Sequence, residues 1–191
     1  MSRIPVLSTK DAGLFTKLAY RFARRRCGAI PEPFAVVAHH GGLLAAYAVH
    51  EMAVEKASRA LPANVREIAV YRVAVRVGCS WCVDFGTMLQ KHQGLDIDRL
   101  KHIDDYATSP HFSRPERLAI AYADAVTATP VSVTDEQVAE LEREFGRKGA
   151  LELTYQIALE NSRSRTNSAL GIVDQGFTSG EACRVPLPGL A

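Results

Sequence analysis

The sequence predicts an all-α protein, and three observations lead to this fold class. Along most of the chain, apolar residues recur at the three- and four-residue spacing of amphipathic helices. No segment combines a two-residue alternation with a tight turn, the pattern typical of a β-hairpin. Glycines, prolines and capping residues divide the chain into pieces of helical length. We therefore expect one helical domain over residues 1–191, without repeats.

Length and composition narrow the class of protein further. A chain of 191 residues suits one domain with its own core, and 47% hydrophobic residues exclude a disordered chain. The net charge of +2 gives no reason to expect a nucleic acid or a membrane as partner. No apolar stretch approaches the roughly 18 residues of a membrane span. Since no secretory signal is recognisable, we expect a cytoplasmic protein.

In the first part of the chain, the predicted helices are separated by glycines and prolines. The first places Leu14, Leu18 and Phe22 on one face and three arginines in its last turn, where positive charge suits the helix dipole. Its arginine-rich sequence faintly resembles a transit peptide, but a surface helix explains it better. The predicted helical segments are residues 11–27, 34–59 (two helices, or one bent at Gly41-Gly42), 63–77, 79–94 and 96–106.

The second part of the chain carries clear helix-start signals. Ser113 can cap a helix whose first turn holds Pro115, where a missing N–H costs nothing. Thr134 and Gln137 have the spacing of a capping box. We therefore expect helices over residues 113–128, 134–146 and 148–170, the second ending at Gly146 and the last at Gly171.

The candidate site is the C-x-x-C pair, Cys79 and Cys82, in a chain with two other cysteines, Cys27 and Cys183. Three residues apart on a helix, the two side chains share a face and can form a disulfide. A helix N-terminus offers free N–H groups and partial positive charge, which lower the pKa of a thiol. The pair is therefore typical of a redox site, in which a thiolate attacks and the disulfide accepts electrons.

The cysteines allow two other interpretations. A zinc site needs further ligands, but the six histidines show no paired spacing, and the adjacent His39 and His40 would diverge on a helix. A structural disulfide or a pair of buried thiols is the second alternative. Redox chemistry accounts best for the pair, and we expect neither a metal nor a cofactor.

Glu67 is a candidate acid–base group for the thiols. It lies 12 residues before Cys79 on a helix that is otherwise apolar on that face. If the chain reverses at Gly78, we expect Glu67 to lie beside the first turns of the next helix. A carboxylate close to a thiol can accept or relay its proton.

The spacing of Glu67, Cys79, Trp81 and Cys82 resembles the motif of the carboxymuconolactone decarboxylase family, in its alkyl hydroperoxide reductase D-like (AhpD-like) branch. The resemblance extends over residues 32–172 and includes PANVREIAVYRVAVRVGCSWC and RPERLAIAYADAVTATPVSVTDEQVAELEREFG. It implies an all-helical fold, assembly into homo-oligomers, and peroxidase or disulfide-reductase chemistry with a thiol electron donor. By position, Cys82 would be the thiol that attacks the peroxide, Cys79 would be the resolving thiol, and Glu67 would belong to a proton relay.

One position departs from the family pattern. The family places a histidine four residues after the second cysteine, where this chain has Gly86. His92 lies ten residues beyond Cys82, about 15 Å along a helix, and is too far to replace it. Possible supporting groups are Tyr71, Trp81 and Asp84, although we expect Tyr71 to be buried and Asp84 to lie on the opposite face. We therefore expect weak peroxidase activity.

A second polar group of residues lies on the predicted last helix. It comprises Glu160, Asn161, Arg163, Arg165 and Asn167. At helical spacing we expect an exposed stripe, with a pocket lining or a subunit contact as alternatives.

The sequence thus predicts a thiol-dependent peroxidase or disulfide oxidoreductase that acts on a peroxide or disulfide substrate. One alternative is a non-catalytic oligomeric protein that binds a small molecule in the same fold. The other is an enzyme related to the lactone decarboxylases, although the cysteine pair argues against lactone decarboxylation.

Overall fold

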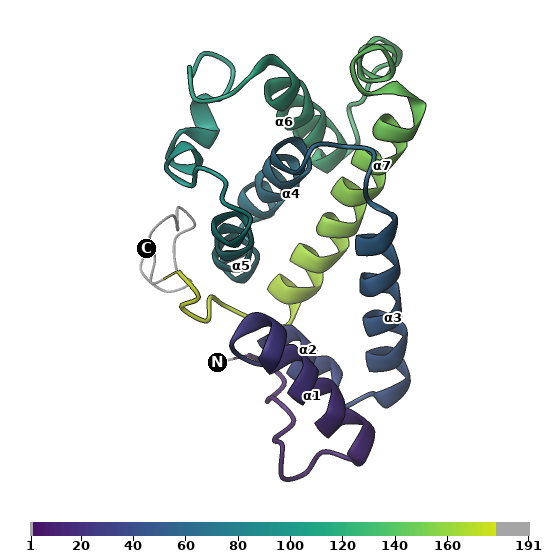
Figure 1. Ribbon diagram of the computed structural model, residues 1–191, viewed down its shortest axis with the longest axis vertical. Helices are drawn as coiled ribbons and strands as arrows, with labels where there is room; N and C mark the ends of the chain where they lie inside the picture. The colour runs from purple at the N-terminus through teal and green to yellow at the C-terminus, as the bar shows by residue number, and fades with distance from the viewer. Residues whose placement is uncertain (1, 179–191) are drawn as a thin grey trace.

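The structure, a computed structural model, describes residues 2–178 and contains helices but no strand in this range, as the sequence predicts. Figure 1 shows the path of the chain. Its elements are α1 (Leu14–Cys27), α2 (Glu32–Val37), α3 (Gly41–Ala57), α4 (Ala63–Val77), α5 (Ser80–His92), the 3-10 helix η1 (Asp98–Asp105), α6 (Arg114–Thr127) and α7 (Asp135–Ala169).

The breaks between helices lie close to where the sequence places them. The region 34–59 forms two helices, because His40 caps α3 and its Nδ1 accepts the N–H of Leu43 at 3.2 Å. Prolines at residues 31 and 33 begin α2 instead of merely ending α1. At Gly146 the φ of +67° interrupts α7, which is the boundary predicted between the last two helices.

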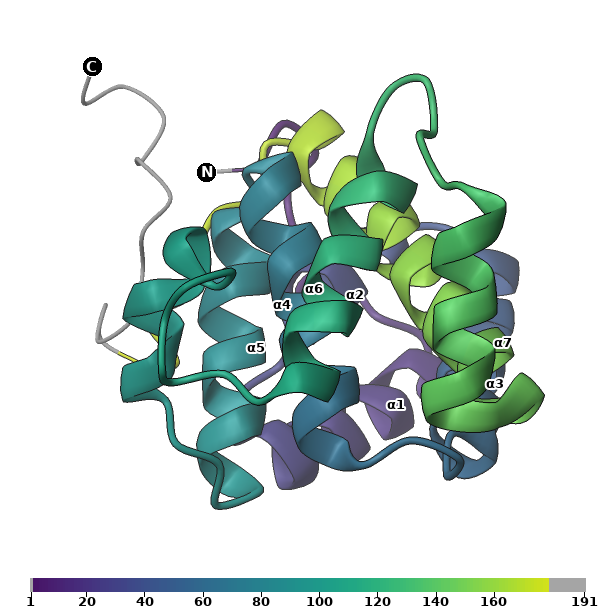
Figure 2. The ribbon, with the colours of Figure 1, turned by 90° about the horizontal axis from the view of Figure 1, so that it is seen from above.

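Helix α4 is the centre of the fold, packed against α5, α6 and α7. Figure 2 shows α5, α4, α6 and α7 side by side, with α3 along the outer side of α7. Apolar residues on opposite sides of α4 enter two core clusters: Ile68 and Tyr71 on the side of α5, and Ala69 and Val73 on the side of α6 and α7. Because α4 has neighbours on several sides, it is the helix against which the site is positioned.

Buried ion pairs fix the neighbours of α4. Arg72, 6% exposed, donates to Asp124 of α6 at 2.7 and 3.1 Å and to Asp104 of η1 at 2.9 Å. Arg99 of η1 is paired with Glu116 of α6, and both side chains are almost fully buried. Such pairs specify one arrangement of the helices, because moving a helix would leave a charge without its partner.

Several helices present apolar residues to solvent. On α1 the buried residues are Thr16, Tyr20 and Ala23, so the face formed by Leu14, Leu18 and Phe22 points outward. Leu43, Val49 and Met52 of α3 are also exposed. Within residues 2–178, no helix has the length and hydropathy that crossing a membrane requires.

Glu116 is expected to make stability depend on pH. Burial alone would raise its pKa, but hydrogen bonds from Ser113 and Asn64 and the charge of Arg99 hold the pKa below its usual value. Glu116 therefore contributes stability at a pH above about 4.3, the pKa of an unfolded glutamate, and this contribution is lost as the pH falls through its lower folded pKa. We expect the free energy of unfolding to fall over this acidic range.

The Glu116→Gln variant tests this assignment, because it leaves Arg99 buried without a counter-charge. We expect the variant to lose about 3 kcal/mol of unfolding free energy at neutral pH. Between pH 5 and 3 its stability should also fall less than that of the native protein. Urea unfolding followed by circular dichroism measures both quantities, and parallel acid profiles in the two proteins would contradict the assignment.

Candidate active site

The two cysteines of the C-x-x-C motif are joined by a disulfide at the N-terminal end of α5. Gly78 ends α4 with a φ of +79°, a left-handed conformation that glycine adopts without strain, and the chain turns at once into α5. Cys79 is therefore the N-cap residue of α5, and its Sγ accepts the N–H of Cys82 at 3.2 Å. The Cα atoms are 5.3 Å apart, and the predicted link within one turn is confirmed.

The surroundings of the two sulfurs differ. The N–H of Cys82 is directed at Cys79 Sγ, so the helix terminus would stabilise negative charge on Cys79 after the disulfide opens. Cys82 is 7% exposed and Cys79 only 2%. Cys82 is therefore the more exposed residue of the pair, and Cys79 is the better leaving group.

Helix α7 supplies a polar group that contacts both sulfurs. The Asn167 Nδ2 atom lies 3.4 Å from Cys82 Sγ and 3.9 Å from Cys79 Sγ. The asparagine is 4% exposed, so little water competes for this contact. The sequence grouped Asn167 with a polar stripe but gave no reason to connect it with cysteines 85 and 88 residues away.

The expectation that this polar stripe is exposed is wrong for its first and last residues, Glu160 and Asn167. Both are buried, together with Ser164 between them, because this side of α7 faces α3 and α5 rather than solvent. Arg163 Nε donates to Glu51 of α3 at 2.9 Å, and its Nη1 lies 3.4 Å from Glu160. Ser164 Oγ donates to Glu160 at 2.8 Å. Burial raises the pKa of Glu160, and the contacts with Arg163 and Ser164 oppose that rise.

The first turns of α5 also hold the segment that follows α7. The Asp84 carboxylate accepts hydrogen bonds from the backbone of Gln175, Phe177 and Thr178 and from the Thr178 hydroxyl, at 2.7–3.2 Å. Trp81 Nε1 donates to the side chain of Gln175 at 2.8 Å. Asp84 is therefore occupied by residues 175–178 and is not a group that supports the thiols.

Tyr71 and Gly86 meet where α4 packs against α5. Tyr71 is 1% exposed, as expected of a buried tyrosine. A Cβ atom added at Gly86 would lie 3.7 Å from the Tyr71 ring, an ordinary contact distance. An alanine would fit here, whereas the imidazole expected from the family pattern would have to share this space with the tyrosine ring.

Glu67 does not lie where the sequence argument placed it. Its Oε1 atom accepts hydrogen bonds from Arg66 at 3.0 and 3.1 Å and lies 3.5 Å from Gln93 Nε2, just past the C-terminal end of α5. Gln93 is 11 residues from Cys82, roughly 16 Å along a helix. The expected reversal at Gly78 is present, but the expected register was wrong: in two antiparallel helices, a residue 11 positions before the turn meets the far end of the second helix.

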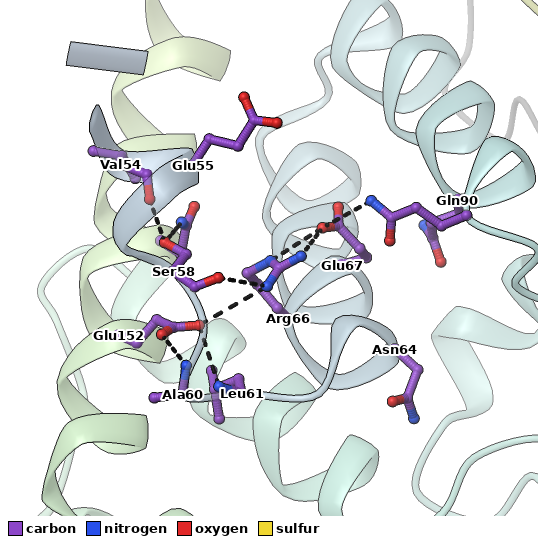
Figure 3. Close-up of polar contacts among 12 residues, drawn as sticks. Val54, Glu55, Ser58, Ala60, Leu61, Asn64, Arg66, Glu67, Gln90 and Glu152 are labelled. Carbon is purple, nitrogen blue, oxygen red and sulfur yellow. Dashed lines mark hydrogen bonds and ion pairs between the residues drawn. The ribbon is translucent and has the colours of Figure 1, made fainter. Parts of the chain in front are cut away.

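Figure 3 shows the network to which Glu67 belongs. Arg66 also donates to the Ser58 carbonyl at 3.2 Å and lies 3.9 Å from Glu152 of α7, which accepts the N–H of Ala60 at 2.7 Å. These contacts fix the connection between α3 and α4. Glu67 thus takes part in the structural network at the end of the fold remote from the sulfurs.

His39, His50 and Cys27 lie apart from this site. Within residues 2–178, no three His, Cys, Asp or Glu side chains are grouped so as to hold a metal ion. His39 contacts the Pro5 carbonyl and His50 the Tyr155 hydroxyl, both at 2.8 Å. Burial raises the pKa of the free thiol of Cys27, and Cys183 lies outside the described residues.

Known proteins resemble the chain in sequence and in fold, although no family model matches it. The uncharacterized protein YnjA of Escherichia coli K12 is 35% identical over 133 residues, which cover 70% of either chain. The alkylhydroperoxidase AhpD core of a peroxidase-related protein from Ralstonia eutropha JMP134 has a TM-score of 0.80, at 18% identity over 92% of this chain and 94% of its own.

The chain belongs to the AhpD-like branch of the carboxymuconolactone decarboxylase family. The debrominase Bmp8 has the same fold, with a TM-score of 0.79 at 19% identity over 91% of this chain and 92% of its own. A Bmp8 variant in complex with 2,3,4-tribromopyrrole gives a TM-score of 0.75 at 20% identity, over 88% and 89%. At these identities the AhpD-like structures establish the fold that was predicted, while the chemistry has to be argued from the residues themselves.

Mild oxidation of the reduced protein should close the Cys79–Cys82 disulfide within each chain. Both cysteines lie in the tryptic peptide of residues 77–91, so oxidation should lower its mass by two hydrogen atoms and leave it uncrosslinked. In the reduced protein Cys27 should react with iodoacetamide more slowly than the pair, because burial raises the pKa of its thiol. Peptide mass spectrometry measures both, and a Cys27–Cys183 link formed first would contradict the assignment of the redox centre.

Proposed function

We propose that this AhpD-like protein is a thiol-dependent oxidoreductase that reduces hydroperoxides through Cys82 and Cys79. The observation that carries the proposal is the disulfide at the N-terminus of α5, where each sulfur accepts a hydrogen bond. A disulfide serving only for stability would not need donors directed at its sulfurs, because these interactions strengthen when a thiolate forms. The more accessible Cys82 is assigned to the attack and Cys79 to resolution.

The reaction consumes one hydroperoxide per thiol pair. The Cys82 thiolate attacks a peroxide oxygen, an S–O bond forms as the O–O bond breaks, and the alkoxide takes a proton from water to give an alcohol. Cys82 is left as a sulfenic acid. Cys79 then attacks the Cys82 sulfur, and the sulfenic oxygen leaves as water. The peroxide has gained the two electrons that the thiol pair has lost.

A dithiol donor closes the cycle. Its first thiolate attacks Cys82 Sγ, forms a mixed disulfide and displaces Cys79, whose negative charge is stabilised by the N–H of Cys82. The second thiol of the donor then displaces Cys82. The donor leaves as a disulfide, and its two protons and two electrons restore the thiol pair.

Glu67 and a relay histidine have no part in this proposal. The carboxylate of Glu67 is held by Arg66 beside Gln93, and Gly86 occupies the histidine position. A single acid–base group typically contributes roughly 100-fold or more to a rate. We therefore expect slow turnover compared with a protein that has the complete relay.

Aromatic rings beside the sulfurs favour a second substrate class. Trp81 stacks on Phe85 with ring centroids 4.7 Å apart, and Phe177 packs edge-on against Phe85 at 5.4 Å. Cys79, Cys82 and Trp81 belong to one core cluster. An aromatic bromide such as 2,3,4-tribromopyrrole could exchange bromine for hydrogen while the thiol pair is oxidised, releasing bromide and a proton. Bromide release measured beside peroxide consumption decides between the two substrates.

Substitution of the two cysteines tests the assigned roles. With dithiothreitol as donor and tert-butyl hydroperoxide as substrate, Cys82→Ser should lose all measurable turnover. Cys79→Ser, reduced and then freed of dithiothreitol, should consume about one equivalent of the hydroperoxide and stop at a sulfenic acid, because neither the resolving thiol nor an external thiol is present. Peroxide consumption and mass spectrometry of the trapped sulfenic acid measure these outcomes.

Cys27→Ser is the matched control, since it removes a thiol that lies apart from the site. It should retain the native rate. If Cys82→Ser were as active as the native protein, the redox assignment would be lost. Unreactive thiols with no turnover would favour a non-catalytic binding protein instead.

We also propose that the chain assembles into homo-oligomers. The outward face of α1 exposes 77% of Leu14, 60% of Leu18 and 56% of Phe22, and α3 adds further exposed apolar side chains. Several exposed apolar side chains on one helix face are typical of interfaces.

Size-exclusion chromatography with light scattering should therefore give a mass at least twice the chain mass of 20.9 kDa. Replacing Leu18 and Phe22 by Lys should shift the protein towards the monomer, because the charges would be buried at the interface. A native monomer at micromolar concentration would contradict this proposal.

A further inference from the structure

We propose that Asn167 is a catalytic residue of this site, whose side-chain amide donates a hydrogen bond that stabilises the Cys82 thiolate. The identity of the substrate attacked by this thiolate rests on the proposed function above. The acidity of the Cys82 thiol can be measured without any substrate. The two proposals can therefore fail separately.

The contact with the sulfurs is short and shielded from water. Asn167 Nδ2 is 3.4 Å from Cys82 Sγ, a distance at which an N–H donates to a sulfur atom, and 3.9 Å from Cys79 Sγ. Asn167 and Cys82 are only 4% and 7% exposed. Away from water a hydrogen bond to a charged acceptor is stronger, so this donor gains most in strength when Cys82 becomes a thiolate.

The two available donors divide between the two sulfurs. The N–H of Cys82 lies 3.2 Å from Cys79 Sγ and arises from the helix terminus itself. Asn167 is nearer to Cys82 than to Cys79, so the attacking sulfur receives its stabilisation from α7 rather than from its own helix. The stabilisation of Cys82 therefore depends on the position of α7 along α5, because that position brings Asn167 to the sulfur.

An asparagine differs from the histidine that the family pattern places near this sulfur. Its amide can donate a hydrogen bond but does not accept the proton of the thiol at ordinary pH. Asn167 would therefore lower the pKa of Cys82, while the proton itself leaves to water. We expect one ionisation, that of Cys82, to control the thiol reactivity.

Charged groups on α7 and α3 hold Asn167 in position. Glu160, on the same side of α7, is paired with Arg163, which is bound in turn by Glu51 of α3. Tyr47 of α3 lies beside Glu51, and burial raises its pKa to about 12, so it stays neutral in the range of thiol titration. Glu160 is seven residues from Asn167, roughly 10 Å along the helix. The ion pairs of Arg163 join α7 to α3 and so fix the position of α7 along the fold, while Glu160 lies too far along the helix to contact the sulfurs.

A pair of isosteric substitutions on one helix tests the role of Asn167. Asn167→Asp replaces the amide donor with a carboxylate oxygen beside Cys82. Asn161→Asp makes the same change at a side chain that donates to the Thr127 hydroxyl at 3.0 Å and the Ile157 carbonyl at 3.1 Å, remote from the sulfurs. Asn167→Leu removes the donor without adding charge, and provides a second variant should the aspartate prevent folding.

The measurement is the rate of iodoacetamide alkylation of Cys82 as a function of pH, in reduced protein carrying Cys79→Ser. Mass spectrometry of the peptide of residues 77–91 follows Cys82 alone. We expect Asn167→Asp and Asn167→Leu to raise the pKa of Cys82 by about one unit or more, so that alkylation at neutral pH slows about tenfold. Asn161→Asp should leave the pKa within about 0.3 unit of the parent.

A pKa unchanged in a folded Asn167 variant, or raised equally by Asn161→Asp, would overturn the role of Asn167. A loss of helix packing alone would alter the amplitude of circular dichroism and the reactivity of Cys27, which serve as checks on the fold. If the pKa shifts as expected but the native protein consumes no hydroperoxide, Asn167 keeps its role and the proposed function fails. If the native protein consumes hydroperoxide but the pKa of Cys82 is the same in the Asn167 variants, the proposed function stands and the role of Asn167 fails.

Discussion

The position of Cys79 at the N-cap of α5 is the constraint from which the arrangement of the site follows. The left-handed turn at Gly78 reverses the chain between α4 and α5 without a loop, so the first cysteine lies at the helix terminus. The N–H of Cys82 then points at the Cys79 sulfur, and the disulfide closes within one turn. A longer connection would leave the sulfurs free of the helix terminus and of its partial positive charge.

Helix α7 provides the side-chain hydrogen-bond donor that the hairpin of α4 and α5 does not supply to the sulfurs. It brings Asn167 to the sulfurs, and the segment that follows it is bound by Asp84 and Trp81 of the same α5 turns. The buried charges of Glu160 and Arg163 would be costly without Glu51 of α3. They therefore restrict α7 to one register, which is the register that places an amide beside Cys82.

The absence of a histidine at position 86 changes how such a site can work. A relay moves the proton of the thiol to a neighbouring base, whereas an amide donor stabilises the anion after the proton has left. The first arrangement needs room for an imidazole between α4 and α5, where Tyr71 now packs against Gly86. The second needs only a donor from another helix, and Asn167 meets that requirement.

Local patterns determined the helices, most of their ends and the disulfide. Capping residues and glycines act within a few positions of themselves, so the segment 63–77, the cap at Ser113, the capping box at Thr134 and the cysteine link were all predictable from the sequence. Contacts between distant helices depend on register and direction, which spacing along the chain does not specify. The tertiary structure alone therefore removed Glu67 from the thiols, buried the carboxylate of Glu160, and brought Asn167 to Cys82 across 85 residues.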